Sequence, residues 1–141
     1  MPDPLPTALQ LDIVTPDRLV GHSSVGAVSI PGKTGYLGIL PGHAPLLTEL
    51  VPGEIAYTSG GSFHFLAVTW GFAEVLPDRV IVLARTAEHA EEIDVERAER
   101  AKQRAEERLK KVSDLEIDFE RARAALARAL ARLEAAHRLR A

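Results

Sequence analysis

Two arginines, Arg128 and Arg132, stand four residues apart in a segment of helical character, and Arg121 lies one to two turns before them. Side chains at this spacing project from the same face of a helix. Two guanidinium groups on one face can together grip a phosphate or a carboxylate group. On the charge pattern alone, a solvated helix face is the simpler interpretation of the same arginines.

Other residue types that could carry chemistry do not form a site. Gly32-Lys33-Thr34 resembles the end of a phosphate-binding loop, but Ala27 stands where the first glycine is needed, and Gly35-Tyr36 continues as strand and turn rather than helix. No serine occupies a Gly-x-Ser-x-Gly turn, and carboxylates are scarce before Glu88. The five histidines lack metal-ligand spacing, and the chain has no cysteine; they are His22, His43, His64, His89 and His137. The sequence therefore predicts no catalytic residue and no metal site.

The segment GILPGHAPLL, residues 38–47, is unusually apolar and rigid for a connection between elements. One interpretation is a tight turn whose leucines face the core. The other is a preformed apolar patch for a protein partner.

The elements that must position these residues are of two kinds. All ten glycines and all nine prolines fall at or before Pro77. Both residue types punctuate turns and are costly inside helices, so a turn-rich first part is followed by an uninterrupted helical part. We place the boundary between residues 87 and 88, which gives a β domain over 1–87 and a helical hairpin over 88–141.

The first part contains short runs of strand character separated by turns. Residues 54–58 and 63–70 flank a Ser-Gly-Gly-Ser hairpin signal, and residues 71–76 and 79–85 flank Pro77-Asp78. A single strand is expected over 24–30 and another over 36–40. This pattern predicts an all-β sandwich or barrel, with the doubly apolar run 80–84 at its centre.

The second part has helical periodicity. Asp94 stands where an N-cap is expected, and alanines recur at three- and four-residue steps after it. Ser113 and Asp114 interrupt the pattern, and a second apolar stripe begins at Phe119, so we expect an antiparallel pair of helices. An alanine seam buries little apolar area. The hairpin is therefore either packed permanently on the β domain or easily detached from it.

Bulk properties narrow the function further. A net charge of −3 argues against a nucleic-acid partner, whose binding depends on basic residues. No run of about 18 apolar residues occurs, and the N-terminus is not a secretory signal. We expect a cytoplasmic protein that works at a membrane only through a partner.

Several segments together closely resemble the epsilon subunit of bacterial F-type ATP synthases. They are GILPGHAPLL (38–47), Val51-Pro52-Gly53, GFAEVLPDRVIVLA (71–84), AEHAEEIDVERA (87–98) and EIDFERA (116–122). The resemblance covers nearly the whole chain. It departs from many members at Tyr36, where they carry Glu.

The resemblance implies an α+β, mainly β fold: an N-terminal ten-stranded antiparallel β-sandwich followed by an antiparallel two-helix hairpin. It implies a non-catalytic rotor-stalk subunit that needs no cofactor and lies peripherally on the cytoplasmic face of the inner membrane. The implied partners are the gamma subunit, the membrane ring of proton-carrying subunits and, when the hairpin extends to inhibit hydrolysis, the catalytic head. By position, His43 and Thr48 match the part of the family that faces gamma and the ring.

The resemblance also implies ATP as a regulatory ligand of the folded-down hairpin. The residues that match the ATP-binding pattern of some members are Glu88, Ile93, Asp94, Arg97, Ala98, Arg128 and Arg132. A free-standing ATP-sensing module of the same fold is the alternative. A small β-sandwich enzyme is disfavoured because no catalytic constellation is present.

Overall fold

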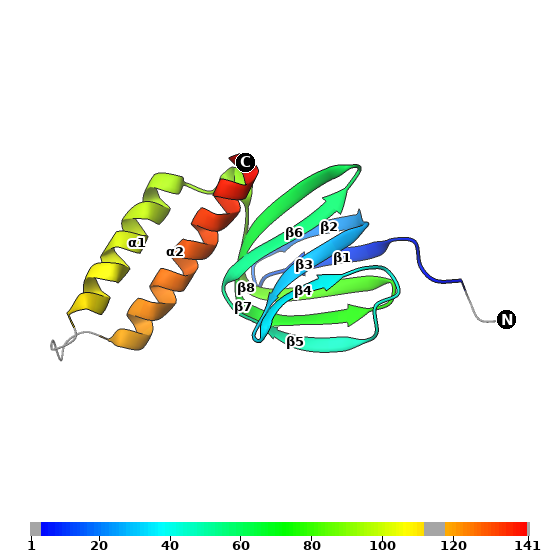
Figure 1. The fold of residues 1–141 in the computed structure, drawn as a ribbon, viewed down its shortest axis with the longest axis horizontal. Coiled ribbons are helices and arrows are strands. Elements are labelled where there is room, and N and C mark those ends of the chain that lie inside the picture. Colours follow the sequence, from blue (N-terminus) through cyan, green and yellow to red (C-terminus); the bar gives the residue numbers. More distant parts are fainter. Residues whose placement is uncertain (1–3, 112–117, 141) are drawn as a thin grey trace.

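The structure, a computed structural model, describes residues 4–111 and 118–140. Figure 1 shows a β domain, the helix α2 lying along one side of it, and the helix α1 outside α2. The strands are β1 (Leu9–Val14), β2 (Leu19–Val25), β3 (Ala27–Gly32), β4 (Gly35–Ile39), β5 (Leu46–Leu50), β6 (Gly53–Ser59), β7 (Ser62–Leu76) and β8 (Arg79–His89). The 3-10 turn η1 (Ala90–Glu92) leads to α1 (Val95–Lys110), and α2 is Phe119–Arg140.

The described residues form eight strands, where ten were expected. Residues 63–76 make one long strand rather than two, whereas the expected strand 24–30 breaks between Val25 and Ala27 into two. The hydrogen-bonded order is β2-β1-β8-β7-β5-β3-β4, and β6 pairs with both β3 and β7. The expected antiparallel sheet is correct for every described pair but one, because β1 and β8 run parallel. Both predicted hairpins, β6–β7 and β7–β8, are confirmed.

The long strand β7 serves both layers of the sandwich. Its first half pairs with β6 and its second half with β5, while β8 follows it on the other edge. The change occurs at Gly71, where a Cβ would lie 1.8 Å from the carbonyl oxygen of Leu83. Only glycine allows the two backbones to come this close.

The sandwich encloses one apolar core drawn entirely from its strands. Leu9, Leu11 and Ile13 alternate inward along β1, and β8 contributes Val80, Val82 and Ala84. This inward-outward alternation is what a strand with one buried face requires. No residue of α1 or α2 belongs to this core. The β domain therefore has the buried interior of an independent folding unit.

The helical part forms the expected hairpin. Asp94 caps α1, since its Oδ1 accepts a hydrogen bond from the backbone N–H of Arg97 at 3.1 Å. The predicted interruption at Ser113 and Asp114 lies outside the described residues. Alanines fill much of the facing surfaces of the two helices; the buried ones include Ala98, Ala105, Ala122 and Ala129. The small side chains let the helices approach closely but bury little area.

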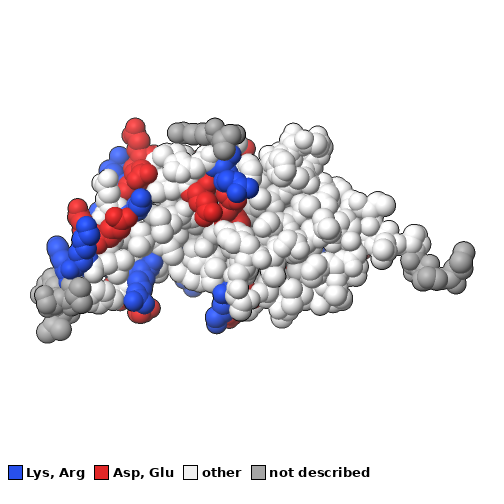
Figure 2. All heavy atoms as spheres, viewed as in Figure 1, with Lys and Arg blue, Asp and Glu red and all other residues white. Residues whose placement is uncertain are grey.

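A second apolar cluster joins α2 to the sandwich. It contains Ala131, Ala135 and Ala136 of α2, Ile93 and Ala90 of the connection, and Phe65 and Ala67 of β7. Because α2 covers the outer face of β7, residues 65–69 are buried on both faces of the sheet. The predicted boundary between residues 87 and 88 stays a prediction, although β8 itself runs to His89. Figure 2 shows that charged side chains gather over the helices, while the sandwich presents few of them in this view.

Candidate functional site

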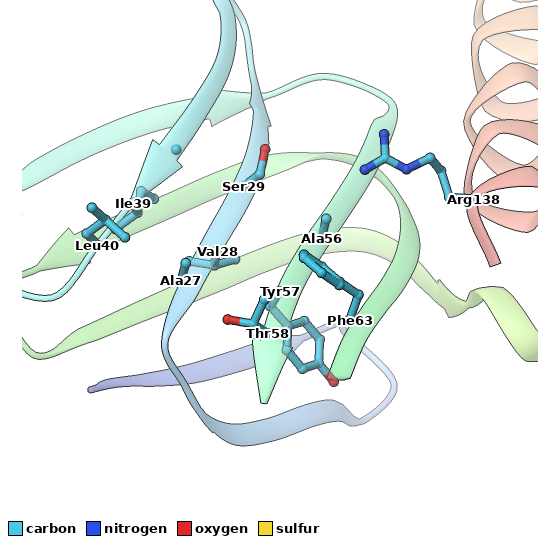
Figure 3. Close-up of a pocket in the computed structure, with 11 residues that line it drawn as sticks. Ala27, Val28, Ser29, Ile39, Leu40, Ala56, Tyr57, Thr58, Phe63 and Arg138 are labelled. Atoms are coloured by element: carbon cyan, nitrogen blue, oxygen red, sulfur yellow. The ribbon is translucent and has the colours of Figure 1, made fainter. Parts of the chain in front are cut away.

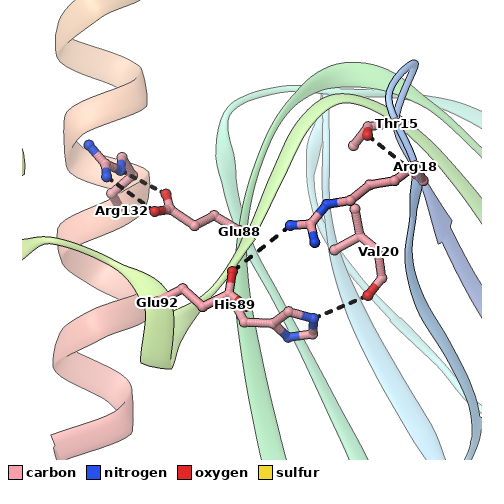
Figure 4. A network of polar contacts seen from close by, with 7 residues as sticks. All are labelled: Thr15, Arg18, Val20, Glu88, His89, Glu92 and Arg132. Carbon is pink, nitrogen blue, oxygen red and sulfur yellow. Dashed lines mark hydrogen bonds and ion pairs between the residues drawn. The ribbon is translucent and has the colours of Figure 1, made fainter.

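An ion pair fastens α2 to the sandwich beside the end of β8. Arg132 donates to Glu88 twice, from Nε to Oε2 at 2.9 Å and from its terminal nitrogen to Oε1 at 3.2 Å. Both side chains are about one-quarter to one-third exposed, at 25% and 31%. Figure 4 shows this two-point contact reaching from the helix to the strand. Such bidentate pairs fix geometry as well as charge.

Two further contacts tie the same end of β8 to the sandwich. The His89 ring bonds through Nε2 to the carbonyl oxygen of Val20 at 3.1 Å, and Arg18 lies 4.0 Å from Glu92 (Figure 4). The strand end that carries Glu88 is thereby held in place. Arg132 meets a carboxylate that is already positioned.

A small cavity of about 220 Å³ opens next to the ion pair. Its polar lining comes from Thr69 and Thr86, whose hydroxyls are 2.6 Å apart, and from Glu88, Arg128 and Arg132. The Arg128 guanidinium also lies over the Trp70 ring, 5.7 Å from its centroid. A cation so placed over an aromatic face is stabilised and oriented.

A second cavity of about 280 Å³ lies in the groove between the helices. Arg104 and Arg108 reach it from α1, and Arg128 and Arg132 from α2. Its other lining residues are alanines, Ala101, Ala105, Ala125 and Ala129, and no acidic residue lines it. Both helices thus bring arginine side chains to this hollow, although the guanidinium groups of Arg132 and Arg128 also contact Glu88 and Trp70. Guanidinium groups are well suited to bind phosphate oxygens. This groove exists only while the two helices are packed together.

The structure brings together only some of the residues matched by sequence. Glu88, Arg128 and Arg132 converge on the first cavity. Arg97 is exposed and lines neither cavity. The Asp94 side chain caps α1 by accepting a hydrogen bond from the backbone N–H of Arg97. Ile93 packs in the apolar cluster under α2, and Ala98 is fully buried in the helix seam.

Arg104 and Arg108 were missed by sequence reasoning. They follow Arg97 by seven and eleven residues, which places all three along one stripe of α1. That periodicity was available as a signal. It could not show which arginines of the stripe would face α2.

The two residues expected at a partner interface lie at the other end of the sandwich. His43, in the connection before β5, bonds through Nδ1 to the carbonyl oxygen of Ala44 at 2.7 Å. Thr48 pairs with the buried Ala73 and faces inward, with its hydroxyl donating to the carbonyl oxygen of Glu49 at 3.2 Å. The outward residue beside it on β5 is Leu47, which is exposed.

An apolar surface lies on the outer face of β5, β7 and β8. We call Leu47, Phe72 and Leu83 the outer apolar patch; they are 69%, 50% and 54% exposed. Phe72 and Leu83 are direct cross-strand partners. The helix α2 packs instead on β6 and the first half of β7, so this patch stays uncovered within the chain. Two exposed glutamates share this face, because Leu47 pairs with Glu74 and Phe72 pairs with Glu49. Exposed apolar side chains of this kind can contact a protein partner.

No described helix is long and apolar enough to cross a membrane. Within residues 4–111 and 118–140, no group of three or more His, Cys, Asp or Glu side chains is arranged to hold a metal ion.

Comparison with known proteins identifies the family. Two family models match, the beta-sandwich domain of the ATP synthase delta/epsilon chain over residues 8–90 and its long alpha-helix domain over residues 91–137. The ATP synthase epsilon chain of Koribacter versatilis is 62% identical over 100 residues, covering 71% of this chain and 70% of that protein. An epsilon chain of Syntrophotalea carbinolica is 44% identical over 130 residues, covering 92% and 94%.

A structural neighbour agrees with this assignment. It is a chain of the Euglena gracilis mitochondrial ATP synthase, in a structure of OSCP, F1 and the c-ring, with a TM-score of 0.83 and 26% identity. The match covers 96% of this chain and 84% of that one. The chain therefore belongs to the ATP synthase delta/epsilon family, as an epsilon subunit, a non-catalytic component of the central stalk.

Proposed function

We propose that the chain couples the rotor stalk to the membrane ring and regulates ATP hydrolysis through its hairpin, which binds ATP when folded against the sandwich. The observation that carries the proposal is the arginine-lined groove between α1 and α2. A ligand that needs both helices in their packed arrangement stabilises that arrangement at the expense of any extended one. ATP would thereby oppose an inhibitory, extended hairpin.

The sandwich is the part that we assign to the stalk. Its outer apolar patch is exposed in the described part of the chain and lies outside the cluster beneath α2. We assign this patch to contact with the gamma subunit. We assign the adjacent end of the sandwich, which carries His43, to the surface that faces gamma and the membrane ring. The subunit would then lie at the membrane, on its cytoplasmic face, only through the complex.

The proposed ATP site binds without turnover. Arginines supply positive charge to the phosphates, but hydrolysis also needs a positioned metal ion and a group that orients water. Glu88 lines the first cavity together with Arg128 and Arg132, and it is already engaged by Arg132. An incoming phosphate must compete with that carboxylate for the same guanidinium.

Calorimetric titration of the full chain with ATP tests the site. We expect saturable heat for the wild type and at least tenfold weaker binding for Arg128→Ala/Arg132→Ala, because each lost guanidinium removes charged hydrogen bonds. Since Arg132 also fastens α2, the variant Arg104→Ala/Arg108→Ala is the cleaner test. It removes two groups that line only the groove.

The matched control is Arg100→Ala/Arg123→Ala, which removes the same charge from exposed positions outside both cavities. It should bind ATP within about twofold of the wild type. No heat at millimolar ATP, or equal weakening by all three variants, would contradict a specific site. The alternative, a free-standing ATP-sensing module, predicts binding but no co-purification with a membrane ATPase.

A further inference from the structure

One carboxyl group, Glu54 of β6, is buried without adequate partners. The residue is 5% exposed, and its Oε2 has no hydrogen-bond partner among the described residues. Its Oε1 lies 3.9 Å from Nε of Arg138, which is an ion pair at the limit of contact and not a hydrogen bond. Glu88, by contrast, receives two hydrogen bonds from Arg132. Of the two carboxyl groups under α2, that of Glu88 is therefore hydrogen-bonded through both oxygens, whereas Oε2 of Glu54 has no described partner.

The cation near Glu54 is the Arg138 guanidinium, and it does not pair closely with the carboxyl. The Arg138 side chain is 55% exposed, and its guanidinium also lies over the Phe65 ring, 5.3 Å from the centroid. Figure 3 shows Arg138 leaning from the helix over the edge of a hollow beside Ala56. Solvent screens the cation, whereas the carboxyl that it faces is shielded from solvent.

The other groups around Glu54 do not compensate its charge. Glu134, also on α2, is a second carboxylate, and the cross-strand partner on β7 is the apolar Ala67. The Tyr36 hydroxyl of β4 accepts from the backbone N–H of Glu54 at 3.1 Å. Burial raises the pKa of Tyr36, so the phenol stays neutral near neutral pH.

These surroundings favour the protonated acid. Burial raises the pKa of Glu54 above its ordinary value, the nearby Arg138 opposes the rise, and Glu134 adds to it. The cover over Glu54 is provided by α2, which packs on β6. If α2 leaves the sandwich, the carboxyl meets water and its pKa returns toward the ordinary range.

We propose that Glu54 is a proton-binding site whose occupancy is coupled to the docking of α2 on the sandwich. The inference rests on the hairpin being detachable, as in the proposed function. Docking takes up a proton, so the docked form gains stability as pH falls from above the docked pKa toward the ordinary value for glutamate. Above the docked pKa, the buried charge opposes docking. Acidification would hold the hairpin folded down, independently of nucleotide.

Two NMR measurements on the full chain test the proposal. The first follows the Glu54 side-chain carbonyl carbon through a pH titration, where we expect a midpoint above the ordinary value for a glutamate side chain. The second compares the hydrogen-exchange protection of α2 amides, such as Ala131 and Ala135, with that of the sandwich core amide Val82 between pH 8 and pH 5. After correction for intrinsic exchange, α2 protection should rise by up to tenfold per pH unit, the limit for one proton.

Glu54→Gln should give α2 protection that is higher than wild type at pH 8 and flat with pH. The matched control is Glu88→Gln, which breaks the other contact under α2; it should lower α2 protection several-fold and keep the wild-type slope. A Glu54 midpoint at or below the ordinary value for glutamate, or equal slopes for wild type and Glu54→Gln, would overturn the proposal. Neither measurement involves ATP, so their outcome does not depend on whether the hairpin binds a nucleotide. If α2 exchanges only together with Val82, the coupling and the detachable hairpin both fall.

Discussion

Arg132 is central to the site because its side chain takes part in two separate features. It lines the groove between the helices and also grips Glu88 of the sandwich. In the folded chain without a ligand, the carboxylate of Glu88 partly satisfies this guanidinium. In the proposed function, a phosphate in the groove would share or displace that contact, so ligand binding and helix docking would depend on the same side chain. This shared side chain would be enough to couple ligand binding to helix docking, without a longer series of contacting residues between them.

Gly71 should be the least replaceable glycine of the sandwich. In Gly71→Ala, the new methyl group would overlap the carbonyl oxygen of Leu83, which belongs to a central strand and cannot move freely. We expect a loss of roughly 3 kcal/mol or more in the free energy of unfolding, beyond the usual range for overpacking. Urea denaturation followed by circular dichroism measures it.

Gly38→Ala is the matched control, because no atom lies within 4 Å of the position where its Cβ would stand. It should change the unfolding free energy by less than about 1 kcal/mol. Similar losses for the two variants would show that the bend at Gly71 can relax.

Local side-chain chemistry was predictable from sequence, whereas burial by distant elements was not. The cap at Asp94 needs only a side chain that reaches the backbone three residues on, and the structure confirms it. Glu54 reads as an outward polar residue of a strand. Its burial depends on α2, which lies some eighty residues later in the chain. No local pattern around Glu54 contains that information.

Among the strands, the local turns were likewise predictable from sequence, whereas the pairing of distant strands was not. Gly and Pro marked the turns well enough to predict both hairpins around β7. The parallel pairing of β1 with β8 was missed, because register between distant strands is set by the assembled sheet and not by either strand alone. In the segment 38–47, the interpretation that the leucines face the core is wrong, because Leu40, Leu46 and Leu47 are exposed and the buried residue is Ile39. The alternative, a patch for a protein partner, stays a prediction.

The outer face of β7 and β8 should behave as a docking surface. Phe72→Glu/Leu83→Glu places two charges in the outer apolar patch, where burial against a partner would be costly. We expect at least tenfold weaker binding to gamma. The melting temperature should fall only modestly, because both side chains are half exposed but the two new carboxylates are direct cross-strand partners. Surface plasmon resonance with immobilised gamma gives the affinity.

The control for that variant is Leu19→Glu/Phe63→Glu, which puts the same two charges on exposed apolar side chains outside the patch. Its affinity for gamma should stay within about twofold of wild type. Equal weakening by both variants would indicate a general effect of charge rather than a localised surface.

At the scale of the whole molecule, the two domains are held together by weak means. The sandwich has its own core, and the cluster that joins it to α2 is built largely from alanines. Alanine contributes less burial than the leucine or isoleucine that usually fills such an interface. The other contacts described between α2 and the sandwich include the ion pair at Glu88, the long Arg138–Glu54 contact, and arginines over the Trp70 and Phe65 rings. An interface of this kind can be biased by a ligand or a proton.

A chain truncated after Ala90 should therefore keep its fold and lose its regulatory role. It retains every residue of the strand core and the whole of β8. We expect a cooperative melting transition by circular dichroism and continued binding to gamma, because the outer apolar patch is intact. In a reconstituted ATP synthase, ATP hydrolysis should rise several-fold over the complex with the full chain, since no hairpin remains to enter the catalytic head. An unfolded fragment would refute the independence of the sandwich, whereas unchanged hydrolysis with the fragment bound would refute inhibition by the hairpin.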